Sequence, residues 1–168
     1  MEIKILDIDP EKLSAKILAL GAQKVFDQDR TITYFKRADG SAENATFKLT
    51  EESKLKFSAT KLGSEPEEIK VFISRKEEFV KILGFMGYAP VTKVTARRIS
   101  FELGSVDFDI DIFPGIPAFL ELDVPVDASN SQAEIIAQLE LQNNPIVTTS
   151  TPEVFRIYKK DYSREFAL

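Results

Sequence analysis

The stretch Val106–Val124, V-D-F-D-I-D-I-F-P-G-I-P-A-F-L-E-L-D-V, decides the fold of this chain. Residues 106–112 alternate four apolar side chains with three aspartates, a period of two that is typical of a strand with one apolar and one charged face. Phe113–Pro117 interrupts this pattern with turn residues. Glu121 and Asp123 then alternate with apolar residues in a second strand. Paired as a hairpin, the two strands would place up to five carboxylates on one surface, and metal ions or basic groups must offset their repulsion.

The composition limits the chemistry that the chain can perform. Its 168 residues, 43% hydrophobic and 29% charged, are enough for one domain over residues 1–168 with a sizeable core. Cysteine and histidine are absent, which excludes thiolate nucleophiles, Ser-His-Asp triads and zinc sites built on those residues. The net charge of −5 does not indicate a nucleic-acid surface. Without an apolar run that could span a bilayer and without a leader, no membrane partner is expected and the expected location is cytoplasmic.

Patterns of residue spacing predict the remaining elements. Further strands are expected at residues 2–6, 31–35, 45–50, 54–61, 68–73 and 92–103. A first helix is expected to begin at Pro10 after the N-cap Asp9 and to end at Gly21. Two more helices are expected to follow capping boxes, and a short last helix is expected to begin at Ser150. The capping boxes are Ser74 with Glu77 and Ser131 with Glu134.

An internal repeat divides the chain into two halves. Glu2–Ile5 matches Glu68–Val71, and at the same offset Leu20-Gly21 matches Met86-Gly87. Each half has the order strand, helix, several strands. The strands number roughly eight, at which an antiparallel sheet can close into a small barrel. We therefore expect an α+β fold, an eight-stranded antiparallel β-barrel with the helices packed on its outside.

In such a barrel the polar strand positions would face a charged lumen, because the helices would cover the apolar positions. Carboxylates on some strands and cations on others are what a polyphosphate with Mg²⁺ or Mn²⁺ requires. These groups could support phosphoryl or nucleotidyl transfer without His or Cys. The same alternation also fits a sheet with one face open to water. The expected inward positions are Glu2, Lys4, Lys48, Lys54, Lys56, Lys70, Arg98, Asp107, Asp109, Asp111, Glu121 and Asp123.

The chain resembles the CYTH, or triphosphate tunnel metalloenzyme, superfamily, and most closely its class IV adenylyl cyclase-like branch. The resemblance lies in Glu2–Ile5, Leu20–Ala22, Ala96–Leu103, Asp109–Asp123 and the closing segment with Ser150, Thr151, Phe155 and Tyr158. It implies an eight-stranded tunnel that binds triphosphate compounds with Mg²⁺ or Mn²⁺. Members hydrolyse inorganic triphosphate or thiamine triphosphate, or cyclise ATP.

The resemblance also implies roles for single residues. Lys4 would bind phosphate or activate the attacking group, and Glu2 and Lys4 would be the catalytic pair. Lys56 is a substitute for a lysine that the family has at the position of Ser58. The implied metal ligands are Glu2, Asp111, Glu121 and Asp123. The implied phosphate-binding residues are Lys4, Lys48, Lys56 and Arg98.

Several positions depart from the family pattern. The first Glu of the Glu-x-Glu-x-Lys signature would precede Met1, Thr46 stands where a paired Arg is expected, and Ala96 stands where a Lys is common. Two functions therefore remain open. The first is a metal-dependent phosphohydrolase or adenylyl cyclase acting on ATP, inorganic triphosphate or thiamine triphosphate. The second is a degenerate, non-catalytic module that binds a nucleotide or polyphosphate. The sequence does not indicate an oligomeric state.

Overall fold

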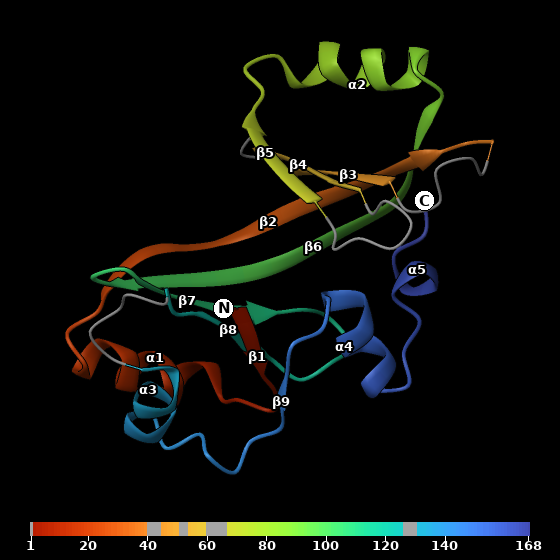
Figure 1. The fold of residues 1–168 in the computed structure, drawn as a ribbon. Coiled ribbons are helices and arrows are strands. Elements are labelled where there is room, and N and C mark those ends of the chain that lie inside the picture. The colour runs from red at the N-terminus through yellow and green to blue at the C-terminus, as the bar shows by residue number, and fades with distance from the viewer. Residues whose placement is uncertain (1, 40–44, 51–53, 60–66, 126–130) are drawn as a thin grey trace. The chain divides into compact units, whose positions relative to one another are not determined.

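The computed structural model describes residues 2–39, 45–50, 54–59, 67–125 and 131–168 of the chain (Figure 1). For residues 45, 46, 50, 54–59, 67, 68 and 70 it describes the backbone alone. The chain divides into two units, the first made of residues 1–29 and 96–160 and the second of residues 30–95 and 161–168. Each unit combines segments that lie far apart in the sequence. The division into units does not test the predicted single domain over residues 1–168, which stays a prediction.

The described residues form an α+β structure with antiparallel strand pairs, as predicted. The strand order is β5-β4-β3-β2-β6-β7-β8-β1-β9 and is open at both ends, so the closed eight-stranded barrel is not confirmed. The strands are β1 (Glu2–Ile5), β2 (Gln23–Arg37), β3 (Ala45–Thr50), β4 (Lys54–Ala59), β5 (Glu67–Phe72), β6 (Tyr88–Leu103), β7 (Val106–Ile112), β8 (Phe119–Asp123) and β9 (Ile146–Val147). The helices are α1 (Pro10–Ala19), α2 (Lys76–Phe85), α3 (Gln132–Gln138), α4 (Thr151–Ile157) and α5 (Tyr162–Glu165). Among the described residues no helix is long and apolar enough to cross a membrane.

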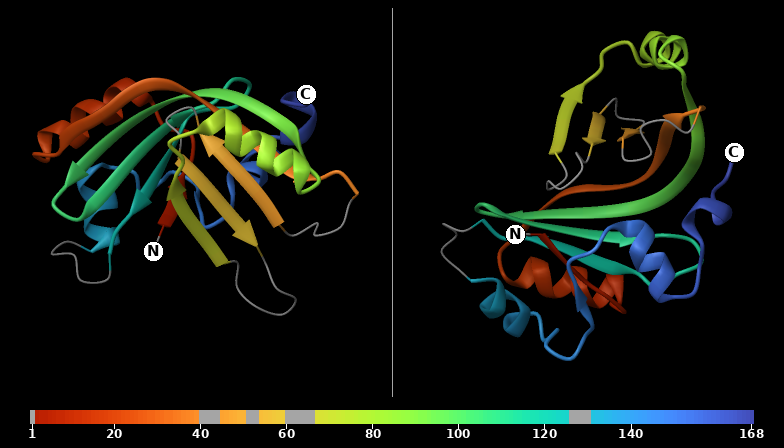
Figure 2. Two further views of the ribbon diagram at one scale, coloured as in Figure 1. Left: turned by 90° about the horizontal axis from the view of Figure 1, so that it is seen from above. Right: turned by 45° about the vertical axis from the view of Figure 1, so that its right-hand side comes forward.

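In the first unit, helices α1 and α3 cover one face of the strands β6, β7, β8 and β1 (Figures 1 and 2). The alternating apolar residues of the opening hairpin supply the sheet side of this core, among them Phe108, Ile110 and Leu122. Leu13 and Ile17 of α1 and Ile135 and Leu139 of α3 supply the helix side, and all of these side chains are buried. The apolar face is therefore the helix-covered face, as the periodicity predicts, and the charged residues lie on the opposite one.

In the second unit, helix α2 packs on strands that carry the same alternation. Leu83 of α2 is buried against Phe35 of β2 and Leu49 of β3. Phe47 adds edge-to-face contacts with Phe79 and Tyr88, whose ring centroids lie at 6.4 and 4.9 Å from its own. The predicted apolar positions of β4 lie outside the described side chains, and residues of the predicted strand end and turn at 60–66 lie outside the described residues.

The internal repeat appears in the elements themselves. Helices α1 and α2 are both ten residues long and begin at the offset that relates the two sequence halves. Gly21 and Gly87 follow the ends of these helices with positive φ angles of 92° and 82°. A side chain would strain the backbone in this conformation, so glycine ends both helices as predicted.

Three of the predicted helix starts are confirmed, and one predicted capping box is wrong. Asp9 accepts from the backbone N–H groups of Glu11 and Lys12, and Ser131 forms its capping box with Glu134. Helix α4 begins after Ser150, although the Ser150 side chain makes no capping bond. Helix α2 instead has Arg75 as its N-cap, with no side-chain capping bond. Its first turn begins one residue later than Ser74 requires, so the hydroxyl is not at the capping position.

Strand β2, with 15 residues, is much longer than the predicted strand at residues 31–35, and β6 begins at Tyr88, before the predicted start at residue 92. The polar residues that begin β2 show no clear alternation, but the strand continues because β6 pairs alongside it in the sheet. Side chains add to this pairing, since Arg97 of β6 forms an ion pair with Asp27 of β2 at 2.9 Å. The short elements β9 and α5 were not predicted, because two or four residues carry too little periodicity.

Candidate functional site: the charged face of the first unit

The charged face is the side of β6, β7, β8 and β1 that lies opposite the core. The register of the four strands places its residues side by side on neighbouring strands. Among the described residues, this face carries seven carboxylates and two cations. One line of paired positions carries carboxylates on all four strands, and we call it the acidic row. The acidic row consists of Glu102, Asp107, Asp123 and Glu2. Four neighbouring anions are unfavourable in an antiparallel sheet unless water or a cation screens them, and all four of these residues are exposed.

The second group on this face is the Arg98 cluster, which we define as Arg98, Asp109, Asp111 and Glu121. Arg98 Nε donates to Oδ1 of Asp111 at 2.6 Å, and its Nη2 donates to Oε2 of Glu121 at 2.6 Å. Nη2 also donates to Oδ2 of Asp111, and Nη1 donates to Asp109. Ser100 donates its hydroxyl to Asp109 from the neighbouring position on β6. One guanidinium on β6 thus connects carboxylates on β7 and β8.

The Arg98 cluster is only partly accessible to water, and Asp111 is its most buried member. Asp111 is 1% exposed and the Arg98 side chain 14%. Phe119 stands opposite Asp111 in the β7–β8 register, and its ring stacks on Phe113 with centroids 5.9 Å apart. Phe155 of α4 packs edge-to-face against Phe113 at 5.6 Å. These aromatic rings lower the local dielectric at this end of the face. A lower dielectric strengthens the ion pairs and makes the loss of any one of them more unfavourable.

Lys4 lies between the two groups of carboxylates. Its Nζ donates to Oε1 of Glu2 at 2.7 Å and lies 3.2 Å from Oε1 of Glu121. The side chain is 7% exposed. Burial alone would lower the pKa of Lys4, but the charges of Glu121 and Glu2 outweigh it and the pKa is raised. Burial opposes the charge of Arg98 in the same way, and Asp111, Glu121 and Asp109 raise its pKa. Both cations therefore stay protonated at neutral pH.

The acidic row shows the opposite effect on a carboxyl group. Loss of surrounding water raises the pKa of Asp107, and the charges of Glu102, Asp109 and Asp123 raise it further. Asp107 remains exposed, so solvent screens part of this repulsion.

The structure places the four predicted metal ligands on one face but not around one point. Glu2 and Asp123 are paired across β1 and β8, whereas Asp111 and Glu121 both contact Arg98. Asp111 pairs with Phe119 of β8. Phe119 is four residues from Asp123, which corresponds to about 13 Å along the strand. Among the described residues no group of three or more His, Cys, Asp or Glu could hold a metal ion.

The residues nevertheless fit the chemistry of Mg²⁺ or Mn²⁺. All the candidate donors are carboxylate oxygens, the hard ligands that these ions prefer. Mg²⁺ in particular is commonly held by one or two carboxylates together with substrate phosphates and water. Two pairs on this face each offer two carboxylates: Glu2 with Asp123, and Asp111 with Glu121. Arg98 already contacts both members of the second pair.

The predicted phosphate-binding residues are divided between the two units. Lys4 and Arg98 belong to the charged face of the first unit. Lys48 of β3 belongs to the second unit, where it is half-buried and pairs in register with Tyr34 and Lys56. Lys56 pairs in turn with Lys70, and the side chains of both lie outside the described ones.

Two residues on the charged face were missed as site candidates. The sequence pattern predicts that Asp109 points inward but indicates no role for it, and it indicates no role for Ser100. The Asp107–Asp109–Asp111 alternation with Arg98 and Ser100 on the preceding strand was the available signal. Sequence alone does not show which of the three aspartates an arginine on the next strand reaches, because that depends on the hairpin register.

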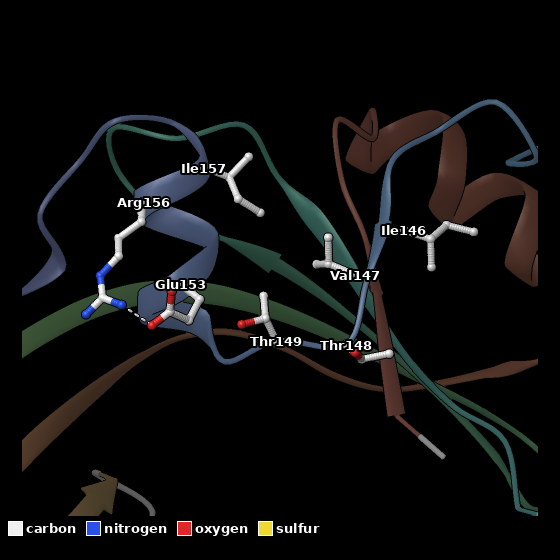
Figure 3. A pocket seen from close by; sticks show the side chains of 7 residues that line it. All are labelled: Ile146, Val147, Thr148, Thr149, Glu153, Arg156 and Ile157. Atoms are coloured by element: carbon white, nitrogen blue, oxygen red, sulfur yellow. Dashed lines mark hydrogen bonds and ion pairs between the residues drawn. The ribbon is translucent and has the colours of Figure 1, made fainter.

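A pocket of about 680 Å³ lies beside the charged face, between β9 and α4 (Figure 3). Residues Ile146–Thr149 line one side, and Glu153, Arg156 and Ile157 of α4 line the other. Val147 is the residue opposite Lys4 in the β1–β9 register. Glu153 and Arg156 form an ion pair with each other. None of the predicted site residues lines this pocket.

Comparisons with known proteins support the fold. No family model and no curated protein matches the sequence. Among solved structures, a proposed adenylate cyclase from Vibrio parahaemolyticus matches with a TM-score of 0.71 at 12% identity, over 93% of this chain and 97% of that one. A proposed adenylate cyclase from Bacillus halodurans matches with a TM-score of 0.60 at 14% identity, over 92% and 95% of the two chains.

A third match links the same fold to a second activity. HpAC1 from Hippeastrum, a proposed adenylyl cyclase described as having a dominant triphosphatase activity, has a TM-score of 0.60 at 14% identity, over 95% of this chain and 97% of that one. At these identities the likeness concerns the fold. The order of elements, the internal repeat and these three matches agree with the resemblance seen in the sequence, and they show that the chain has the fold of these three structures.

Proposed function

We propose that this chain is an enzyme that binds a triphosphate-containing compound together with Mg²⁺ or Mn²⁺ and either hydrolyses or cyclises it. The observation that carries the proposal is the charged face, on which buried Lys4 and half-buried Arg98 lie among seven carboxylates of the described residues. A triphosphate alone would be repelled by this excess of negative charge. Divalent cations shared by carboxylates and phosphate oxygens would remove the repulsion. The described activities of proteins with this fold support the same choice of substrate.

The metal ion, when bound, would polarise a phosphate group and neutralise charge that develops on it. The remaining roles belong to residues of this chain. Glu2 and Glu121 hold the Lys4 ammonium from two sides, and its third N–H can be donated to a phosphate oxygen. Because its pKa is raised, Lys4 stays charged and serves as a hydrogen-bond donor; the raised pKa does not favour a role as general base.

The proposal is tested with a panel of substrates and a single conservative substitution. Release of phosphate and of cyclic AMP is measured from ATP, inorganic triphosphate and thiamine triphosphate, each with Mg²⁺ and with Mn²⁺. We expect turnover of at least one compound and a loss of about 100-fold in kcat for Glu121→Gln, because Glu121 is a metal-ligand candidate that also contacts both Lys4 and Arg98. Glu11→Gln, an exposed change on α1, is the matched control. No turnover of any compound, or turnover that Glu121→Gln leaves unchanged, contradicts the proposal.

The second candidate function is a module that binds polyphosphate without chemistry. It is favoured by one observation, that Arg98 and Lys4 already engage the carboxylates that would hold a metal. Calorimetry with inorganic triphosphate separates the two functions. Binding without product release supports the module, whereas binding with efficient release of phosphate or cyclic AMP supports the enzyme.

A further inference from the structure

The hydrogen bonds of Arg98 leave little of its guanidinium for a ligand. The group has five N–H bonds. Nε–H is donated to Asp111, both N–H bonds of Nη2 are engaged by Asp111 and Glu121, and one of Nη1 is donated to Asp109. At most one N–H, on Nη1, can be donated elsewhere. The two-pronged contact by which arginine recognises phosphate needs two parallel N–H bonds.

Arg98 cannot turn away from the carboxylates at low cost. Asp111 is 1% exposed and lies opposite Phe119 in the β7–β8 register, so water can do little to stabilise its ionised form. A phosphate that drew Arg98 away would remove the guanidinium that donates to both oxygens of this buried carboxylate, which is far more unfavourable than breaking an exposed pair. Lys4, by contrast, keeps an N–H available without giving up either of its carboxylates.

We propose that Arg98 is a positioning residue, which holds Asp109, Asp111 and Glu121 in place as their fixed counter-ion and stays on them while other cations bind the phosphates. Its reach across three strands sets the spacing between Asp111 on β7 and Glu121 on β8, two of the predicted metal ligands. This assignment replaces the phosphate-binding role that the family resemblance implies for Arg98. The claim that other cations bind the phosphates rests on the proposed function, whereas the claim that Arg98 holds the three carboxylates does not.

The hold of Arg98 on the carboxylates is tested without any ligand, by thermal unfolding of a double-mutant cycle. Arg98→Met leaves three carboxylates clustered, and we expect its Tm to fall by about 10 °C. Arg98→Met/Asp111→Asn removes the most deeply buried of these charges and should recover much of that loss, so that the two changes are strongly coupled. Arg98→Lys keeps the positive charge but loses the planar guanidinium with its several N–H bonds. Its Tm should lie between those of wild type and Arg98→Met. A Tm for Arg98→Met within about 2 °C of wild type, or effects that simply add, would overturn the proposal.

The second measurement separates positioning from phosphate binding, and it uses Arg98→Lys because this variant is the one expected to fold best. Inorganic triphosphate with Mg²⁺ should bind Arg98→Lys within about threefold of its wild-type affinity, while kcat falls because the carboxylates are less well placed. Lys4→Met, the matched comparison, should lose about tenfold or more in affinity. A tenfold loss of affinity in Arg98→Lys with an unchanged Tm shows a phosphate ligand and refutes the assignment. If wild type binds no triphosphate, the proposed function fails and the unfolding cycle alone decides the role of Arg98.

Discussion

Carboxylates on the same sheet face are stabilised in two different ways in this protein. Those of the Arg98 cluster are only partly accessible to water and share one guanidinium, as Asp111 and Glu121 show. Those of the acidic row are exposed to solvent, and Lys4 forms an ion pair with one of them, Glu2. A substitution that removes one negative charge should therefore have opposite effects in the two places.

Asp107→Asn tests the acidic row. The folded-state pKa of Asp107 lies above its unfolded-state value, so the folded protein binds this proton more tightly than the unfolded chain. The ionised carboxyl destabilises the fold at neutral pH, and the penalty is relieved as the pH falls through the raised pKa. We expect Asp107→Asn to raise the free energy of unfolding at pH 7 by no more than about 0.5 kcal/mol, because the group is exposed and screened. Chemical unfolding at pH 7 and pH 3 measures it.

The effect of Asp107→Asn should vanish at pH 3, where the wild-type carboxyl is protonated as well. Asp29→Asn, an exposed change on β2 outside the acidic row, serves as the control for loss of one charge. A stabilisation of equal size in both variants, or one that persists at pH 3, would argue against repulsion along the row.

At the scale of single elements, two helices provide a matched comparison of capping. Ser131 and Ser150 are both N-cap residues with nearly the same extended backbone, at φ −72°, ψ 156° and φ −70°, ψ 158°. Only Ser131 accepts a capping bond through its side chain, from the backbone N–H of Glu134. We expect Ser131→Ala to lower the free energy of unfolding by about 1 kcal/mol and Ser150→Ala to lower it by clearly less. Urea unfolding of both variants decides this, and equal losses would contradict the assigned role of the hydroxyl.

The sequence predicted elements well where local chemistry decides them. Asp9-Pro10 and Gly21 define α1 through capping and backbone conformation, which depend on neighbouring residues alone. The sequence predicted elements poorly where pairing between strands decides their length. The strand β2 begins at Gln23, well before the alternation that starts near Thr31, because it is extended alongside β6. The capping box at Ser74 failed since a one-residue shift of the helix start is invisible in the sequence pattern.

The candidate site shows the same limit. Alternation within the hairpin identified the charged face, because side-chain direction follows parity. It could not show that Arg98 would lie opposite Asp111 and reach Glu121 as well, since those neighbours follow from strand register and from an arginine's reach. The four residues predicted as metal ligands therefore lie on the face that the alternation predicted, while their division into two pairs required the structure.

At the scale of the whole molecule, negative charge is concentrated on one face of the first unit. The chain carries a net charge of −5, and among the described residues the charged face of the first unit alone has seven carboxylates against two cations. The ligand-free fold therefore contains repulsion that a bound divalent cation would remove. A ligand that binds the folded chain and not the unfolded one raises stability by mass action.

Mg²⁺ or Mn²⁺ alone, without a triphosphate, should therefore stabilise the protein. At a tenfold excess over the dissociation constant the expected gain is about 1.4 kcal/mol, which corresponds to a rise in Tm of about 3–6 °C for a chain of this length. Scanning calorimetry over a series of cation concentrations measures the shift, and a chelator should reverse it. Monovalent salt at matched ionic strength is the control, because general screening would also reduce repulsion. Asp123→Asn removes one carboxylate of the Glu2–Asp123 pair and should reduce the shift. A rise in Tm that matched salt reproduces in full would mean that the face is screened by ions without binding one.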